Sequence, residues 1–162
     1  MKIIFILLLN VMLLSGCNHT KIASSEYSLK SGGVVPASQQ GLAVADVDLV
    51  FKITPATKFL EGEARLTLRT EATRDEFSVD LDQRFSILEV SVNDVVLKPT
   101  QYSNPDGMLL VKQAVSEDFT ITIKYRGHPR IPVNAPWDDG IVWDTTPNGL
   151  PWIATAVQGG GC

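Results

Sequence analysis

The sequence has 162 residues, 44% of them hydrophobic, and a formal net charge of −4. Its cations are scattered singly among acids, which argues against nucleic acid as a partner, because phosphate binding needs clustered Lys and Arg. About 120 residues of patterned chain are enough to bury one core, so we expect a single folded domain.

The N-terminus is typical of an export signal. Lys2 precedes an apolar run at 3–14 that is broken only by Asn10. This run is too short for a spanning helix, which takes about 20 apolar residues. We therefore expect residues 1–16 to be a signal peptide that is removed, which leaves 13 basic and 18 acidic residues and a net charge of −5.

The end of this signal, LSGC at 14–17, resembles the lipobox of bacterial lipoproteins, whose cysteine becomes the lipidated first residue. The resemblance implies that Cys17 anchors the chain to a membrane of the cell envelope, since each buried methylene contributes about 0.8 kcal/mol. Asn18 favours the outer membrane where there are two. An ordinary signal peptide with an incidental cysteine is the alternative. Cys162 is the only other cysteine, so no intramolecular disulfide is expected once Cys17 is acylated.

Residues 17–40 are mostly polar or small, and we expect them to form a flexible, lipidated tether. The folded domain is then 41–162. Alternation of apolar and polar residues at 45–53 and again at 64–69 predicts two strands joined in a hairpin. We expect its apolar side chains to be buried on one face: Val47, Leu49, Phe51, Leu66 and Leu68.

Further short strands are predicted between turn residues, and no segment has a convincing helical period. The candidates are Glu76–Asp82, Ser86–Val92, Val95–Lys98, Met108–Val111 and Phe119–Tyr125, with turns at 93–94 and 104–107. This pattern is typical of an all-β domain, either an antiparallel sandwich or a strongly twisted sheet.

After Gly127 the sequence is rich in proline and predicts a loop-rich edge instead of a regular sheet. The three tryptophans lie here, and we expect them to pack this edge against the sheet. The alternative is that they form a sugar-binding platform with Tyr125. The nearby acids, Asp138, Asp139 and Asp144, fit no calcium-loop spacing and predict a solvated turn.

No catalytic centre is predicted. His128 is the only histidine in the folded region, whereas a catalytic zinc takes about three protein ligands. No G-x-S-x-G motif occurs, and His128 is expected to end a strand. The glycines at 159–161 lack the Lys and Ser/Thr of a phosphate loop.

Several segments together resemble one family. The segment DVDLVFKITPATKFLEGEA at 46–64 looks like the opening hairpin of peptidase family M1, the aminopeptidase N and leukotriene hydrolase family. The segments VDLD at 79–82, 87–92 and ITIKYRG at 121–127 follow in the family's order. The end of the chain, GIVW at 140–143 and PWIATAVQGGGC at 151–162, resembles the stretch before the zinc domain in bacterial members.

This resemblance implies a saddle-shaped N-terminal β-domain, with zinc held in a catalytic domain that this chain does not include. It also implies that Gln158, followed by the slim backbone of Gly159, helps to bind the α-amine of a peptide substrate. The chain has no H-E-x-x-H motif, so it is not expected to be catalytic by itself. The alternatives are a freestanding β-sandwich envelope lipoprotein that binds glycan or protein, and a structural envelope protein without a ligand.

Overall fold

The computed structural model describes residues 34–135, 137 and 139–156. The signal peptide, Cys17, Gln158 and Gly159 lie outside this range, so the expectations for them stay predictions. Ten strands and two short 3-10 turns, Pro55–Thr57 and Pro99–Gln101, make up the described structure. The strands are β1 (Leu42–Thr54), β2 (Phe59–Thr70), β3 (Phe77–Asp80), β4 (Phe85–Val92), β5 (Val95–Val96), β6 (Tyr102–Ser103), β7 (Met108–Val111), β8 (Asp118–Gly127), β9 (Gly140–Thr145) and β10 (Pro151–Ala156).

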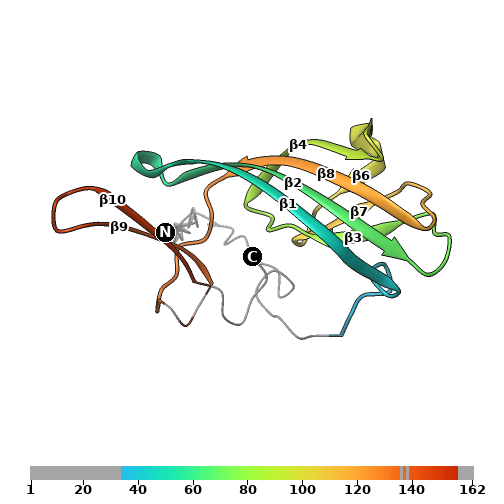
Figure 1. Cartoon of the computed structure of the whole chain (residues 1–162), viewed down its shortest axis with the longest axis horizontal. Helices are drawn as coiled ribbons and strands as arrows, with labels where there is room; N and C mark the ends of the chain where they lie inside the picture. The colour runs from blue at the N-terminus through green and yellow to red at the C-terminus, as the bar shows by residue number, and fades with distance from the viewer. Residues whose placement is uncertain (1–33, 136, 138, 157–162) are drawn as a thin grey trace, which may run out of the picture.

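The largest unit is an antiparallel sheet of five strands in the order β1-β2-β8-β4-β5 (Figure 1). The predicted hairpin is confirmed as β1 and β2, which pair from Leu42 with Thr70 to Thr54 with Phe59. β8 lies in the middle and pairs with both β2 and β4. The expected all-β, antiparallel class is therefore confirmed.

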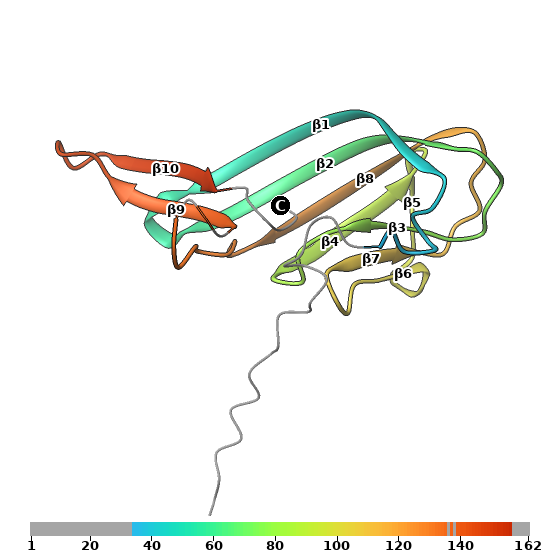
Figure 2. The ribbon, with the colours of Figure 1, turned by 90° about the horizontal axis from the view of Figure 1, so that it is seen from below.

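A second antiparallel sheet, β3-β7-β6, covers part of one face of the large sheet, as Figures 1 and 2 show. One core cluster contains residues of both sheets. Phe77, Leu109 and Val111 enter it from the small sheet, and Ile121 and Val90 enter it from the large one, all with no exposed surface. We call the face of the large sheet that carries Ile121 its inner face.

The predicted burial of β1 is wrong. Leu68 is buried and Leu66 partly buried, but Val47, Leu49 and Phe51 keep about half of their surface exposed, at 50%, 48% and 48%. The alternation still indicates the correct face, because Val47 pairs with Leu66, which in turn pairs with buried Ile121 on the inner face.

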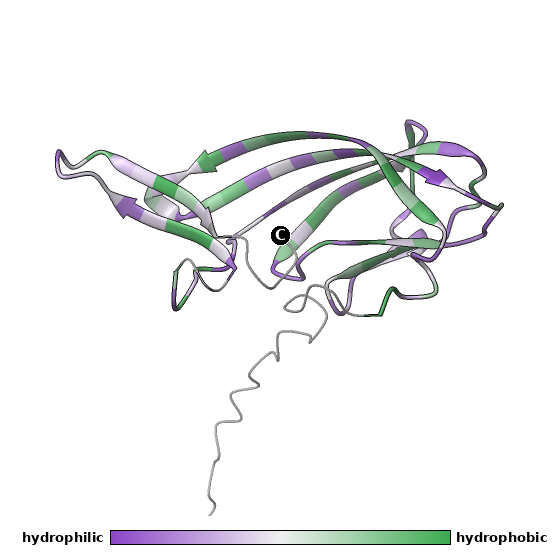
Figure 3. Ribbon diagram, turned by 60° about the horizontal axis from the view of Figure 1, so that its bottom comes forward, coloured by the Kyte–Doolittle hydropathy of each residue, from purple (hydrophilic) through white to green (hydrophobic). Residues whose placement is uncertain are grey.

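The exposure of β1 follows from its position. β1 is the edge strand, and the small sheet packs below the opposite margin of the large sheet (Figure 2). We call its exposed inner-face residues, Val47, Leu49, Phe51 and Ile53, the β1 apolar stripe. A bulge at Ala45 shifts the register, so Val44 before it and Val47 after it share this face. In Figure 3 much of β1 has the colour of hydrophobic residues, although no strand among the described residues covers it.

The last residues of the expected tether pack on the domain. Ser38 Oγ lies 2.7 Å from Ser78 Oγ, and Gln39 Nε2 donates to Asp80 Oδ1 at 2.9 Å. Arg74 donates to the carbonyl oxygens of Ser38 and Gln40. Folded structure therefore begins before Gly41. The residues just before Gly41 add nothing to the core, but they form hydrogen bonds with β3 and with Arg74.

The predicted turns are confirmed. Asn93 and Asp94 both have positive φ, at 50° and 64°, which suits the two-residue connection of β4 and β5. Gly107, with φ of 80°, precedes β7. Among the described residues, no helix is long and apolar enough to cross a membrane.

Candidate functional site

The segment that leads to Gln158 forms a hairpin, which corrects the expectation of an irregular loop. β9 and β10 pair antiparallel along their whole length, from Pro151 with Thr145 to Ala156 with Gly140. The prolines permit this because Pro147 lies in the turn and Pro151 is the first residue of β10, where a strand tolerates proline. The hairpin lies beside the end of the molecule where β1 and β2 are connected (Figure 1).

The base of this hairpin is fixed by a close backbone approach. The amide of Ile141 donates to the carbonyl oxygen of Arg130 at 2.7 Å. Gly140 has φ of +132°, and a Cβ added there would lie 2.3 Å from that same oxygen. Only glycine fits this position, so the direction in which the hairpin leaves the domain depends on it.

The tip of the hairpin is closed by Thr146. Its amide donates to the carbonyl oxygen of Leu150 at 2.8 Å, and its hydroxyl accepts from the amide of Leu150 at 3.0 Å. Gly149, with φ of +78°, donates to the carbonyl oxygen of Thr146. These bonds set the β9–β10 register and thus the strand end from which the chain continues to Gln158.

An open groove of about 350 Å³ lies between the hairpin and the β1–β2 connection. Its walls are mostly apolar, and Lys58 and Asp144 are the charged side chains that line it. The lining residues are Pro55, Ala56, Lys58, Trp143, Asp144, Thr145, Pro151, Trp152 and Ile153. Such a groove suits an apolar group that lies beside one charge of each sign.

The aromatic residues differ from the expected platform. Tyr125 is buried, with 8% of its surface exposed, and packs edge-to-face on Phe85 with ring centroids 5.1 Å apart. Burial raises the pKa of its phenol. Tyr125 therefore cannot join the tryptophans in binding a sugar. Trp137 and Trp152 are 71% and 48% exposed, so the expectation that all three tryptophans pack against the sheet is also wrong.

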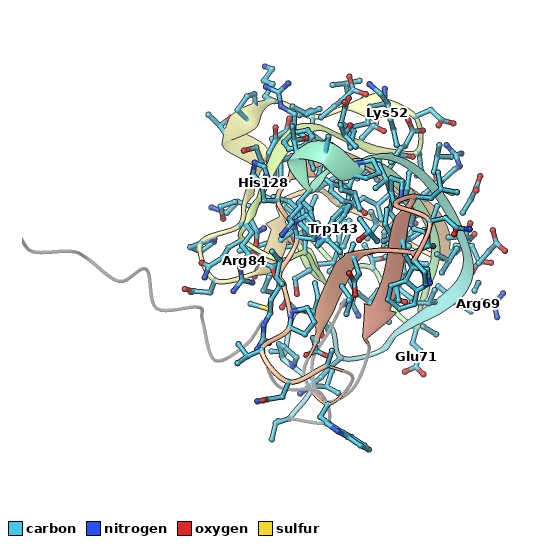
Figure 4. All side chains as sticks on the ribbon, turned by 90° about the vertical axis from the view of Figure 1, so that its left-hand side faces the viewer. Lys52, Arg69, Glu71, Arg84, His128 and Trp143 are labelled. Atoms are coloured by element: carbon cyan, nitrogen blue, oxygen red, sulfur yellow. The ribbon has the colours of Figure 1, made fainter. Side chains whose placement is uncertain are left out.

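Trp143 is the partly buried tryptophan. Its indole Nε1 is buried and has no hydrogen-bond partner among the described residues. Figure 4 places Trp143 near the middle of this end of the molecule, with Lys52, Arg69 and Glu71 toward the margin.

His128 follows β8 directly, as predicted. Its ring lies edge-on to Phe59 at 5.2 Å, and its Nδ1 lies 3.2 Å from the carbonyl oxygen of Lys58. These contacts attach the end of β8 to the β1–β2 connection. In the described part of the chain no group of three or more His, Cys, Asp or Glu side chains could hold a metal, so these residues do not fit a zinc site.

The charged side chains of the outer face form exposed ion pairs. Arg69 donates to both carboxylate oxygens of Asp118, at 2.9 and 3.1 Å, and Arg65 donates to Asp94 at 2.8 Å. The hydrogen bond from each arginine lowers the pKa of its carboxyl partner. Both carboxylates are therefore ionised and paired at neutral pH, which suits a solvated face and not a general acid.

Comparison with known proteins finds a similar fold in solved structures. No protein-family model and no curated protein matches the sequence. The structure is similar to an M1 zinc metallopeptidase from Deinococcus radiodurans bound to a Tyr-Ser-Ala substrate, with a TM-score of 0.52 and 17% identity, covering 70% of this chain and 28% of that one. It is also similar to native yeast LTA4 hydrolase, with a TM-score of 0.50 and 19% identity, covering 70% of this chain and 18% of that one. The chain thus spans less than a third of either protein, and the likeness establishes a shared fold.

Proposed function

We propose that this chain is the N-terminal, substrate-flanking domain of a membrane-anchored zinc aminopeptidase that releases N-terminal amino acids from peptides. The observation that carries the proposal is the shared fold with M1 zinc metallopeptidases, taken with the order of the family-like segments. The described residues hold no group of three or more His, Cys, Asp or Glu side chains that could bind a metal. Zinc and the catalytic groups belong to a further domain.

Two features of the domain support this role. The β1 apolar stripe offers a surface on which another part of a larger enzyme can pack, because large exposed apolar patches mark interaction sites. The β9–β10 hairpin is fixed at its base by the hydrogen bond from Ile141 to Arg130 and at its tip by Thr146, and β10 ends two residues before Gln158. In this proposal the amide oxygen of Gln158 accepts a hydrogen bond from the substrate's α-ammonium group, and Gly159 keeps the backbone slim beside it.

The DNA that follows the codon of Cys162 tests the proposal. A reading frame, continuous or shifted, that encodes H-E-x-x-H supports it. A terminator followed by an unrelated gene contradicts it and favours the freestanding lipoprotein, for which exposed Trp137 and Trp152 would be the binding side chains. In that case, binding of glycans by the purified chain, and its loss in Trp152→Ala, would be the next measurement.

The role of Gln158 is tested in the complete enzyme. A hydrogen bond to a charged group contributes about 1.5–3 kcal/mol, so Gln158→Ala should lower kcat/KM on amino-acid anilides roughly tenfold to a hundredfold with an unchanged melting temperature. Gln158→Glu should retain activity, because it still presents an oxygen to the cation. Gln40→Ala is the matched control, since the side-chain amide of Gln40 donates to the carbonyl oxygen of nearby Val35, and its bonds to Pro36 and Arg74 are made by the backbone, which alanine keeps. An alanine variant as active as the parent would remove Gln158 from the site.

Membrane attachment completes the proposal. Lipid on Cys17 would hold the enzyme in the cell envelope, on the periplasmic or surface side of the outer membrane where there are two. Residues 18–33 would then separate the domain from the bilayer. The peptide substrate and the membrane are the partners, and nucleic acid is not one of them.

A further inference from the structure

The outer edge of β1 carries a long row of unpaired backbone groups. β1 ends the five-stranded sheet, and in the part of the chain that the structure describes no strand pairs with its outer edge. It is 13 residues long. Edge strands of this length are templates for pairing with another chain, and most proteins shorten or cover them. The sequence of β1 indicates what would pair with it.

The usable part of the edge is the regular stretch 46–54. The bulge at Ala45 interrupts the strand on one side, and the 3-10 turn that starts at Pro55 ends it on the other. When a strand pairs with a second copy of itself across a twofold axis, a residue on the axis faces its own copy. Val50 is the midpoint of this stretch, so an axis at Val50 pairs all nine residues of one copy with those of the other. In this register outer-face residues lie opposite outer-face residues, and inner-face residues lie opposite inner-face residues.

The outer face is complementary in this register. Val50, which is 61% exposed, meets Val50 of the second copy. On each side of this pair, Asp48 of one copy lies opposite Lys52 of the other, which places two opposite-charge pairs symmetrically about the axis. Moving the axis to Asp48 or Lys52 would place a like charge opposite itself. Moving it to Leu49 pairs Asp46 with Lys52 but brings the bulge into the overlap.

The inner face is complementary in the same register. The four residues of the β1 apolar stripe pair only with one another, Val47 with Ile53 and Leu49 with Phe51, each twice across the axis. The stripe then becomes a continuous apolar band of eight side chains over two copies. Apolar cross-strand pairs of this kind stabilise antiparallel sheets.

We propose that two copies of this chain pair antiparallel through β1, with Val50 at the twofold axis and Asp48 opposite Lys52, to form one continuous sheet. Such an interface is isologous, since each copy contributes the same strand. The pairing uses the strand edge and does not depend on the proposed enzymatic role.

Cysteine cross-linking tests the register in the full chain with Cys17→Ser and Cys162→Ser, where an added thiol is the only one. Facing Cα atoms of an antiparallel pair lie about 4.5–5.5 Å apart, within the range of a disulfide. Val50→Cys should therefore give a covalent dimer under mild oxidation at micromolar concentration. Val44→Cys is the matched control, because Val44 is equally exposed, at 62%, but lies beyond the bulge with no partner strand residue in the proposed pairing. Equal cross-linking of the two variants, or none, would overturn the proposal.

A charge exchange tests the chemistry of the pairing. In the Val50→Cys chain, Lys52→Asp places a second carboxylate opposite Asp48 and should slow cross-linking about tenfold. Adding Asp48→Lys restores opposite charges and should restore the rate. Lys52 also bonds Glu61 at 3.0 Å, and Asp48 lies opposite Arg65 within the chain, so the melting temperature of each variant must be compared. A double variant that stays folded but does not recover the rate would show that β1 does not pair in this register.

Discussion

Replacing Gly62 with alanine should destabilise the domain through Tyr125. Gly62 pairs with Tyr125 across β2 and β8, and a Cβ at Gly62 would lie 2.5 Å from Cζ and 2.8 Å from the hydroxyl oxygen of that ring. The ring cannot keep its place above an alanine. The ring would have to leave its edge-to-face contact with Phe85. Tyr125 is only 8% exposed, so the ring has little open space into which it could move.

The expected size follows from opposing effects. Overpacking of this kind costs about 1–3 kcal/mol, and the lost aromatic pair adds about 0.5–1.5 kcal/mol. Alanine also lowers the conformational entropy of the unfolded chain, which stabilises the folded state by about 0.4–1 kcal/mol. Together these effects span about 0.5–4 kcal/mol, so we expect Gly62→Ala to lower the free energy of unfolding by about 2 kcal/mol, as measured by urea denaturation with tryptophan fluorescence.

The double mutant Gly62→Ala/Tyr125→Leu tests whether the loss of stability comes from the clash with the Tyr125 ring or from placing any side chain at this position of β2. Leucine lacks the Cζ and hydroxyl atoms that meet the new Cβ, so in a Tyr125→Leu background Gly62→Ala should be neutral or slightly stabilising. The two substitutions should thus couple by about 1–3 kcal/mol. If Gly62→Ala costs the same free energy in both backgrounds, or costs none in the parent, the steric argument is wrong.

Three further outcomes are expected. Cys17→Ala should move the protein from the membrane to the soluble fraction and remove the lipid mass, and an unchanged mass in the membrane fraction would contradict lipidation. The purified 162-residue chain should show no aminopeptidase activity and less than stoichiometric zinc, whereas one tightly bound zinc would reveal a ligand set among residues that the structure does not describe. Arg69→Gln should raise the pKa of Asp118 toward 3.8, observed by NMR titration of its carboxyl carbon. Since the folded pKa is the lowered one, the pair contributes stability above the ordinary pKa of the carboxyl and loses it as the pH falls through the folded value, so parent and variant should converge in acid.

Period-two alternation predicted the strands before Gly127, apart from the two-residue β6, because it is a local property. It placed β7 at its observed bounds and β8 within a few residues, and the turn at Asn93 follows from residues that accept positive φ. Burial is not local. The alternation of β1 indicated the correct face for Val47, but whether a second layer covers that face depends on where β3 and β7 pack.

The β9–β10 hairpin was missed because proline is a signal for loops. The residues between the prolines carried a weaker signal, since Ile141, Val142 and Trp143 are β-branched or aromatic residues, which are enriched in strands. The groove could not be predicted, because it joins Pro55 to Trp152, which lie far apart in the sequence. The burial of Tyr125 likewise depends on Gly62, its neighbour on another strand.

The central position of β8 has a consequence for how the chain folds. β2 can pair with β1 as soon as residue 70 is available, but its other edge must wait for β8, which begins at Asp118. β4 waits for the same strand. Closing such distant pairs is slow, and the waiting edges can pair with other chains in the meantime. A chain emerging from a ribosome or a translocation pore therefore keeps two incomplete half-sheets until Gly127 arrives, and a chaperone that shields those edges would act in that interval and not after it.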